Sequence, residues 1–142
     1  MRSWISTLVL YTISTASFAG ITCGYLNITI NNTTGQNCTL QNSVIYNGSL
    51  GDIPIPSTIA NGQMTQSFTL EQSYIGGPSL LLEYRCGTEN ISFVSSQDFC
   101  FLSAGNIIGQ VEVANNMNAQ YASIIGSFWS KLPGQINWTL TS

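Results

Sequence analysis

The stretch LLLEYRCGTENISFVSSQDFC, residues 80–100, decides the fold that the sequence predicts. Apolar residues alternate in its first half, which places one set on a single face: Leu80, Leu82, Tyr84 and Cys86. The segment GTEN (87–90) has the composition of a tight turn, and the alternation resumes after it at Ile91 and Phe93. We therefore expect two antiparallel strands in the middle of a β-sheet core.

Toward the N-terminus the alternation recurs in YLNITI (25–30), which points Leu26, Ile28 and Ile30 inward. The segment 31–35 is rich in Asn, Thr and Gly and predicts a turn. We expect residues 36–46 to return from it as the second strand of a hairpin. Asn42 interrupts the apolar face of that strand, which indicates a β-bulge or an early strand end.

Toward the C-terminus, IIGQVEVA (107–114) predicts a strand. Its period-two pattern turns Ile107, Val111 and Val113 inward. Gly109 lies on the same face, where a missing side chain indicates a close approach of the backbone to a neighbour.

The last strand follows Pro133 and Gly134, which suit the central positions of a type II turn. Its inward residues are Ile136, Trp138 and Leu140. The whole chain thus reads as about 8–9 short strands at intervals of about ten residues, without a helical period. The predicted fold is all-β, a single antiparallel β-sandwich domain spanning 20–142.

Residues 1–19 have the pattern of a signal peptide. Arg2 provides a positive start, residues 4–13 (WISTLVLYTI) form a short apolar run, and Ser17 and Ala19 are the small residues of a cleavage site. The apolar run is too short to span a bilayer. We expect the mature protein to begin at Gly20 and to be secreted or periplasmic.

Charge and composition exclude several classes of function. Without residues 1–19 the chain has two cations, Arg85 and Lys131, against six carboxylates, a net charge of −4. Phosphate neutralisation of nucleic acid is not expected from such a chain. The absence of histidine excludes Ser-His-Asp and Cys-His nucleophiles and the commonest zinc ligand. We expect no metal and no cofactor.

Four cysteines in an exported chain predict two disulfides, for which three pairings exist. The local pairing joins Cys23 to Cys38 and Cys86 to Cys100. In the expected hairpin, however, Cys23 lies some five residues beyond the partner of Cys38. At about 3.3 Å per residue, this gap exceeds the Cα separation of roughly 7 Å that a disulfide tolerates. We favour Cys38–Cys86 and Cys23–Cys100 and keep the local pairing as the alternative.

Three carboxylates near the central strands suggest a catalytic alternative. Glu83 and Glu89 flank the Cys86 turn and could approach each other, as could Asp98. Two such carboxyl groups are the catalytic residues of most glycoside hydrolases. Glu83 is equally explained as a solvated residue paired with Arg85. No polar substrate-binding cluster accompanies these residues in the sequence, so we expect a protein without enzymatic activity.

The segment YASIIGSFWSKLPGQINW (121–138) holds the candidate binding residues, which are Phe128, Trp129, Lys131 and Leu132. Trp rings with polar edges suit a membrane interface or a ligand surface. Lys131 would add attraction to anionic headgroups. The alternative is structural, with Trp129 covering a sheet edge. Trp138 is expected in the core.

Three short motifs carry a resemblance to known families: ITINN (28–32), GGPSLLLEY (76–84) and GSFW with GQINWTL (126–129 and 134–140). In these motifs the chain resembles aegerolysins and, more distantly, actinoporin-type cytolysins. YRCG and PGQINWT also resemble motifs in small exported proteins of intracellular gammaproteobacteria. The resemblance implies a small β-sandwich and, in the first two families, lipid binding.

These observations lead to three hypotheses about function. The first is an exported, non-enzymatic binding protein that recognises a lipid membrane or a host-cell surface, as cytolysins and virulence proteins do. The second is a small extracellular hydrolase that uses Glu83, Glu89 or Asp98. The third is a structural or inhibitory domain that binds another protein.

Overall fold

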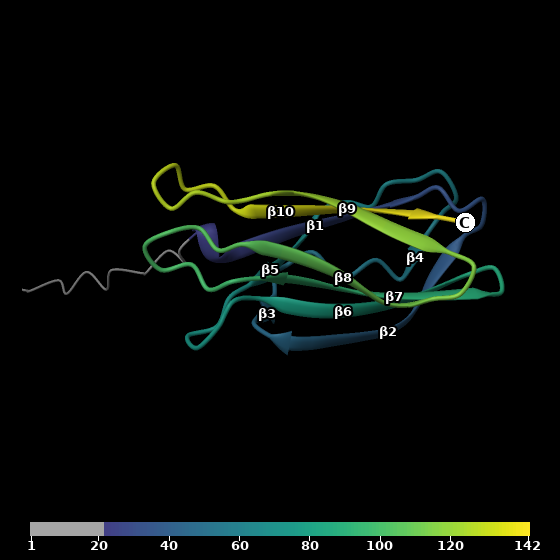
Figure 1. Cartoon of the computed structure of the whole chain (residues 1–142), viewed down its shortest axis with the longest axis horizontal. Coiled ribbons are helices and arrows are strands. Elements are labelled where there is room, and N and C mark those ends of the chain that lie inside the picture. The colour runs from purple at the N-terminus through teal and green to yellow at the C-terminus, as the bar shows by residue number, and fades with distance from the viewer. Residues whose placement is uncertain (1–21) are drawn as a thin grey trace, which may run out of the picture.

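The computed structural model describes residues 22–142 and consists of two five-stranded sheets packed face to face (Figure 1). The predicted signal peptide and its cleavage site lie outside the described residues. The first sheet has the order β3-β5-β1-β10-β9 and the second β4-β2-β6-β7-β8. In chain order the elements are a 3-10 turn η1 (Thr22–Gly24), β1 (Tyr25–Asn32), β2 (Cys38–Asn47), β3 (Ser49–Leu50), β4 (Thr58–Ile59), β5 (Phe68–Glu71), β6 (Ser79–Cys86), β7 (Glu89–Gln97), β8 (Ile107–Ala114), β9 (Asn118–Ile124) and β10 (Gly134–Thr141).

The predicted sandwich and its central hairpin are confirmed. β6 and β7 pair antiparallel, with Tyr84 opposite Ile91, and Gly87 takes the left-handed φ of +64° in the turn between them. One pair departs from the antiparallel pattern, because β1 and β10 run parallel, with Ile28 opposite Ile136. The first and last strands of the domain therefore lie side by side in one sheet.

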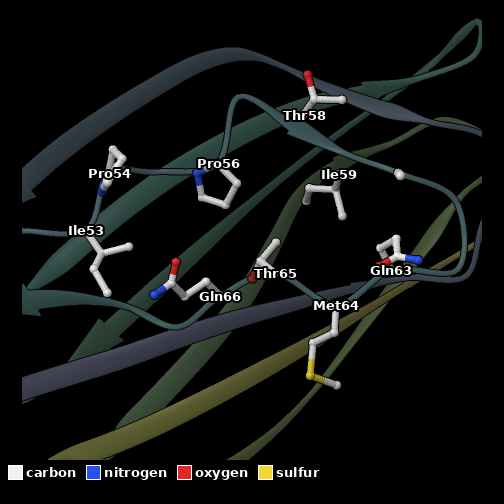
Figure 2. Close-up of a pocket in the computed structure, with 10 residues that line it drawn as sticks. Ile53, Pro54, Pro56, Thr58, Ile59, Gln63, Met64, Thr65 and Gln66 are labelled. Atoms are coloured by element: carbon white, nitrogen blue, oxygen red, sulfur yellow. The ribbon is translucent and has the colours of Figure 1, made fainter.

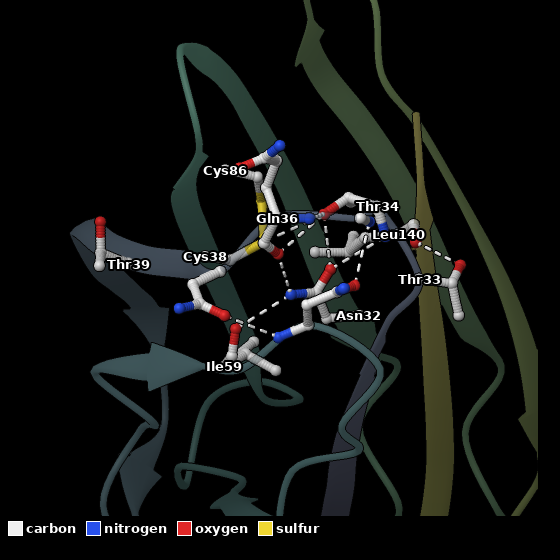
Figure 3. The surroundings of a disulfide bond; sticks show 12 residues. Asn32, Thr33, Thr34, Gln36, Cys38, Thr39, Ile59, Cys86 and Leu140 are labelled. Atoms are coloured by element: carbon white, nitrogen blue, oxygen red, sulfur yellow. Dashed lines mark hydrogen bonds between the residues drawn. A yellow bond between two sulfur atoms is a disulfide. The ribbon is translucent and has the colours of Figure 1, made fainter.

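The predicted hairpin between residues 25–30 and 36–46 is wrong, because β1 and β2 belong to different sheets. The connection is fixed by Asn32, which is fully buried (Figure 3). Its Nδ2 donates to the carbonyls of Gln36 (2.7 Å) and Ile59 (3.0 Å), and its Oδ1 accepts from the hydroxyl of Thr34 (2.7 Å). A buried amide with these partners stabilises a crossing from sheet to sheet.

Both favoured disulfides are confirmed, although the hairpin register used to argue for them was wrong. Cys38 on β2 lies opposite Cys86 on β6, with their Cα atoms 4.1 Å apart. Cys23 joins Cys100 with a Cα separation of 5.8 Å. The expected bulge at Asn42 is present, as a register shift between β2 and β6. The two disulfides fit an oxidising extracellular or periplasmic environment.

Trp138 occupies the middle of the core, as predicted, and is 1% exposed. Its ring centroid lies 4.6 Å from that of Phe93 and 5.2 Å from that of Tyr121. Its Nε1 donates to Ser95 Oγ at 2.8 Å, so the one polar atom of the indole is satisfied. The close approach at Gly109 is also confirmed, because a Cβ there would lie 2.8 Å from the Trp138 ring.

Two of the expected inward residues of β8 are not buried. Val111 is 37% and Val113 is 49% exposed. β8 is an edge strand, and a bulge opposite Ser92 and Phe93 shifts the register. Val111 then lies opposite Phe93 and Val113 opposite Ser92, so the two valines lie on opposite faces of the sheet.

The predicted type II turn at Pro133 and Gly134 is also wrong. The residue with a left-handed backbone is Lys131, at φ 53°, and Gly134 is already the first residue of β10. Gly134 is needed for space, since a Cβ at this position would collide with the side chain of Gln97.

Candidate functional site

Three connections come together at one end of the sandwich, the left end in Figure 1. They are the β5–β6 loop (72–78), the β7–β8 loop (98–106) and the β9–β10 loop (125–133). The strand pairing places them there, because β1 and β10 both begin at this end, with Leu26 opposite Gly134. We call these three loops the apolar end, for the side chains described next.

The β9–β10 loop brings together the four predicted binding residues. Trp129 is 86% exposed, so it does not cover a sheet edge, and Leu132 and Lys131 are exposed beside it. The Phe128 ring is half-buried and meets the Trp129 ring edge-on at 5.3 Å. Paired backbone hydrogen bonds between Ser127 and Leu132, of 2.9 and 3.0 Å, close the loop. Trp129 is thus presented to solvent from a defined turn.

The β5–β6 loop exposes two further apolar residues that the sequence analysis missed. The exposed fractions of Tyr74 and Ile75 are 102% and 93%. Polar bonds fix the base of the loop, where Asn47 Nδ2 donates to the carbonyl of Gly77 at 2.7 Å and Ser73 Oγ donates to Asn47 Oδ1 at 2.9 Å. The two apolar side chains extend from an anchored loop.

The β7–β8 loop adds a third apolar group, also missed. Phe99, Phe101 and Leu102 are 40%, 62% and 70% exposed, whereas Cys100 between them is fully buried. Because the Cys100 side chain turns inward to its disulfide with Cys23, the side chains on both sides of it turn outward. The disulfide therefore presents this apolar group at the surface.

Hydrogen bonds join two of the three loops. The Cys100 N–H donates to Gln72 Oε1 at 2.8 Å, which ties the β7–β8 loop to the β5–β6 loop. Lys131 and Asp98 are the charged residues of the three loops at neutral pH, so their net charge is zero. The connections at the opposite end are polar in sequence: TTGQN (33–37), GT (87–88) and NNM (115–117). The four most exposed large apolar side chains of the described residues thus all lie at the apolar end: Tyr74, Ile75, Leu102 and Trp129.

A sequence signal for the two missed loops does exist. SYIGGPS (73–79) and FCFLSAG (99–105) set large apolar residues among Gly, Ser and Pro, where loop residues are usually polar. Their gathering with the Trp129 loop depends on which strands are neighbours, and that order is not visible in local patterns.

The structure does not bring the three candidate catalytic carboxylates together. Glu83 lies opposite Ser92 on β7, and Glu89 lies opposite Cys86, so the two carboxylates are on opposite faces of the sheet. Asp98 follows the far end of β7. At about 3.3 Å per residue it lies roughly 30 Å along the strand from Glu89. The pairs lack the separation of about 5–10 Å, on one face, that glycoside hydrolysis needs.

Similarity to known proteins is found in the fold. No protein-family model and no curated protein sequence matches the chain. The structure of the lipid binding protein Nakanori superposes with a TM-score of 0.68 at 12% identity, over 87% of this chain and 72% of that chain. The structure of IP-1A from Alcaligenes faecalis superposes with a TM-score of 0.54 at 15% identity, over 83% of this chain and 90% of that one.

These identities show a shared fold and no more. The particular resemblance to aegerolysins and actinoporin-type cytolysins stays a prediction from the short motifs. No helix within residues 22–142 is long and apolar enough to cross a membrane.

Proposed function

We propose that this protein is an exported, non-enzymatic protein that binds the surface of lipid bilayers through its apolar end. The observation that carries the proposal is the gathering of exposed apolar side chains on three neighbouring loops. Trp129, Tyr74 and Ile75 are the most exposed of them, at 86%, 102% and 93%. Large exposed apolar patches mark interaction sites in soluble folds.

The number of loops matters for the strength of binding. Burial of one large apolar side chain contributes about 1.5–3 kcal/mol, and a single lipid-like anchor gives marginal, reversible binding. Three loops that insert together offer several such contributions. The indole of Trp129 and the phenol of Tyr74 also suit the boundary between headgroups and acyl chains, because each ring has a polar edge.

Two further observations support the proposal. The lipid binding protein Nakanori has the same fold, with a TM-score of 0.68. The Cys23–Cys100 and Cys38–Cys86 disulfides, together with the predicted signal peptide, fit a protein that acts outside the cytoplasm.

Flotation of residues 20–142 with phospholipid vesicles tests the proposal, with quenching of tryptophan by brominated lipids as the second readout. This form of the protein has two tryptophans, and Trp138 is buried in the core. We expect quenching to come from Trp129 and to disappear in Trp129→Phe.

Ile75→Ala and Met64→Ala form a matched pair of variants. Both remove an exposed apolar side chain, but Ile75 lies at the apolar end and Met64, which pairs with Asn31, lies toward the other end of β1. Ile75→Ala should weaken flotation and Met64→Ala should not. Failure of the unmodified protein to float with vesicles of any composition would disprove membrane binding.

A further inference from the structure

A second candidate site lies away from the apolar end, at the edge of the sandwich formed by the connections on either side of β4 (Figure 2). The chain crosses here from β3 in one sheet to β4 in the other and back to β5. This crossing borders a half-open cavity of about 290 Å³, in which Ile59 is the buried lining residue and most of the others are exposed. Ten residues line it: Ile53, Pro54, Pro56, Thr58, Ile59, Ala60, Gln63, Met64, Thr65 and Gln66.

Both walls of the cavity are fixed to the sheets. On one wall the Tyr84 hydroxyl donates to the Pro56 carbonyl at 2.6 Å, and the neighbouring Ser57 carbonyl accepts from a β2 amide. On the other wall Thr65 N–H donates to the Ile30 carbonyl at 2.9 Å, and Thr65 Oγ1 accepts from Ile30 N–H at 3.0 Å. A cavity held in this way is formed before a ligand arrives, which lowers the entropic cost of binding.

The lining combines apolar surface with neutral polar groups. Figure 2 shows Pro54, Pro56 and Ile59 on one side of the space, with Thr65 and Gln66 on the other. The Gln66 amide makes no hydrogen bond to another described residue, so its donor and acceptor are available to a ligand. None of the ten lining residues is ionisable.

From these features we infer that the cavity is a binding site for a small uncharged polyol, of the size of one neutral sugar ring. The C–H face of such a ring fits the proline and isoleucine wall, and its hydroxyls can bond to the Gln66 and Gln63 amides. A charged ligand would be partly dehydrated here and would find no counter-charge among the lining residues, which is unfavourable. The volume is close to that of the smallest ligand pockets, so the cavity holds a single ring.

The expected affinity is weak. The cavity lacks an aromatic ring for stacking, and a ligand of about a dozen heavy atoms at ordinary efficiency has a Kd in the millimolar range. The site is independent of membrane binding, because none of its lining residues belongs to the apolar end.

The test is a ¹H–¹⁵N NMR titration of residues 20–142 with a panel of neutral monosaccharides, each up to about 50 mM in view of the expected weak affinity. Matched hexuronic acids and amino sugars serve as the charged comparison. We expect a neutral sugar to shift the amide signals of residues 53–66, with little response to the charged forms. Absence of shifts for every neutral sugar, shifts at the apolar end instead, or an equal response to charged sugars would overturn the inference.

Two variants sharpen the result. Ala60→Phe fills the cavity from an exposed position and should abolish the shifts, while the rest of the spectrum reports that the fold is intact. Gln66→Leu removes one amide and should weaken binding about fivefold. Trp129→Ala should leave sugar binding unchanged, and Ala60→Phe should leave vesicle binding unchanged, so the two sites are tested separately. Unchanged sugar binding in both cavity variants would also overturn the inference.

Discussion

Gln72 holds Cys100 with both ends of its side-chain amide. The Cys100 N–H donates to Gln72 Oε1 at 2.8 Å, and Gln72 Nε2 donates to the Cys100 carbonyl at 2.9 Å. Cys100 is also bonded to Cys23. The backbone between Phe99 and Phe101 is therefore fixed on both sides, and the two rings stay exposed at the surface.

Gln72→Leu should loosen this loop. Loss of two hydrogen bonds to a buried segment should lower the free energy of unfolding by about 1–3 kcal/mol and reduce vesicle affinity, because the apolar groups lose their fixed positions. Chemical denaturation and vesicle flotation measure the two effects. Gln41→Leu is the control, since Gln41 is exposed and bonds to Thr39 nearby. A stability loss with unchanged flotation would show that presentation does not depend on Gln72.

The two tryptophans should respond in opposite ways to truncation. Trp138→Ala removes a buried ring and should cost about 3–5 kcal/mol of stability. Trp129→Ala removes an 86% exposed ring, so the melting temperature should barely change while vesicle binding falls at least several-fold. Thermal melts and flotation measure both. A large fall in melting temperature for Trp129→Ala would contradict the exposed position of its ring.

Local patterns were sufficient for most of the strands. Residues such as Leu82, Tyr84, Ile136 and Trp138 were assigned to the core from period-two alternation, because the pleat of a strand is a local property. The Trp129 loop was recognised because aromatic residues beside a lysine and a proline are conspicuous in a sequence. The loops of Tyr74 and Phe101 become part of the same surface through strand order, which depends on pairings between residues far apart in the chain.

The wrong hairpin and the wrong assignment of Val113 also result from interactions that local patterns do not show. The turn at 31–35 has the same local chemistry in a hairpin as in a crossing between sheets. The crossing is selected by the buried Asn32 amide and by β10, which takes the place beside β1. Val113 was assigned to the core from its alternation with Val111. The assignment is wrong because the bulge in this edge strand reverses the faces of all residues beyond it.

Gly109→Ala should destabilise the protein. The added methyl would lie 2.5 Å from Tyr121 Cδ1 and 2.8 Å from the Trp138 ring, and overpacking of this kind costs about 1–3 kcal/mol. Tyr121 is 43% exposed and its ring can move aside. The double variant with Tyr121→Ala should therefore recover part of the loss in a denaturation experiment. Equal stability of Gly109→Ala and the unmodified protein would show that Tyr121 and Trp138 leave room for a methyl group at Gly109.

Electrostatics should contribute little to membrane binding. Lys131 is balanced by Asp98 in the loops of the apolar end, and one lysine near an anionic surface is worth about 1 kcal/mol. Lys131→Gln should reduce affinity for anionic vesicles by about fivefold at most and leave that for zwitterionic vesicles unchanged. Raising the salt concentration should have a similarly small effect. A large loss of binding to zwitterionic vesicles in Lys131→Gln would contradict a mainly apolar mode of binding.

Alkaline unfolding should report on Tyr84. Burial raises the pKa of its phenol above the usual value of about 10. Between about pH 10 and this raised pKa, the folded state keeps a proton that the unfolded state has lost. The stability contribution of this group is complete below about pH 10 and declines above it, by about 1.4 kcal/mol per pH unit. Tyr84→Phe loses the hydrogen bond to the Pro56 carbonyl and should be less stable at neutral pH, yet its stability should decline less steeply above pH 10. Urea denaturation at a series of pH values measures both slopes, with Tyr74→Phe, which removes an exposed phenol, as the control. Parallel slopes for Tyr84→Phe and the unmodified protein would show that the buried phenol does not set the alkaline limit.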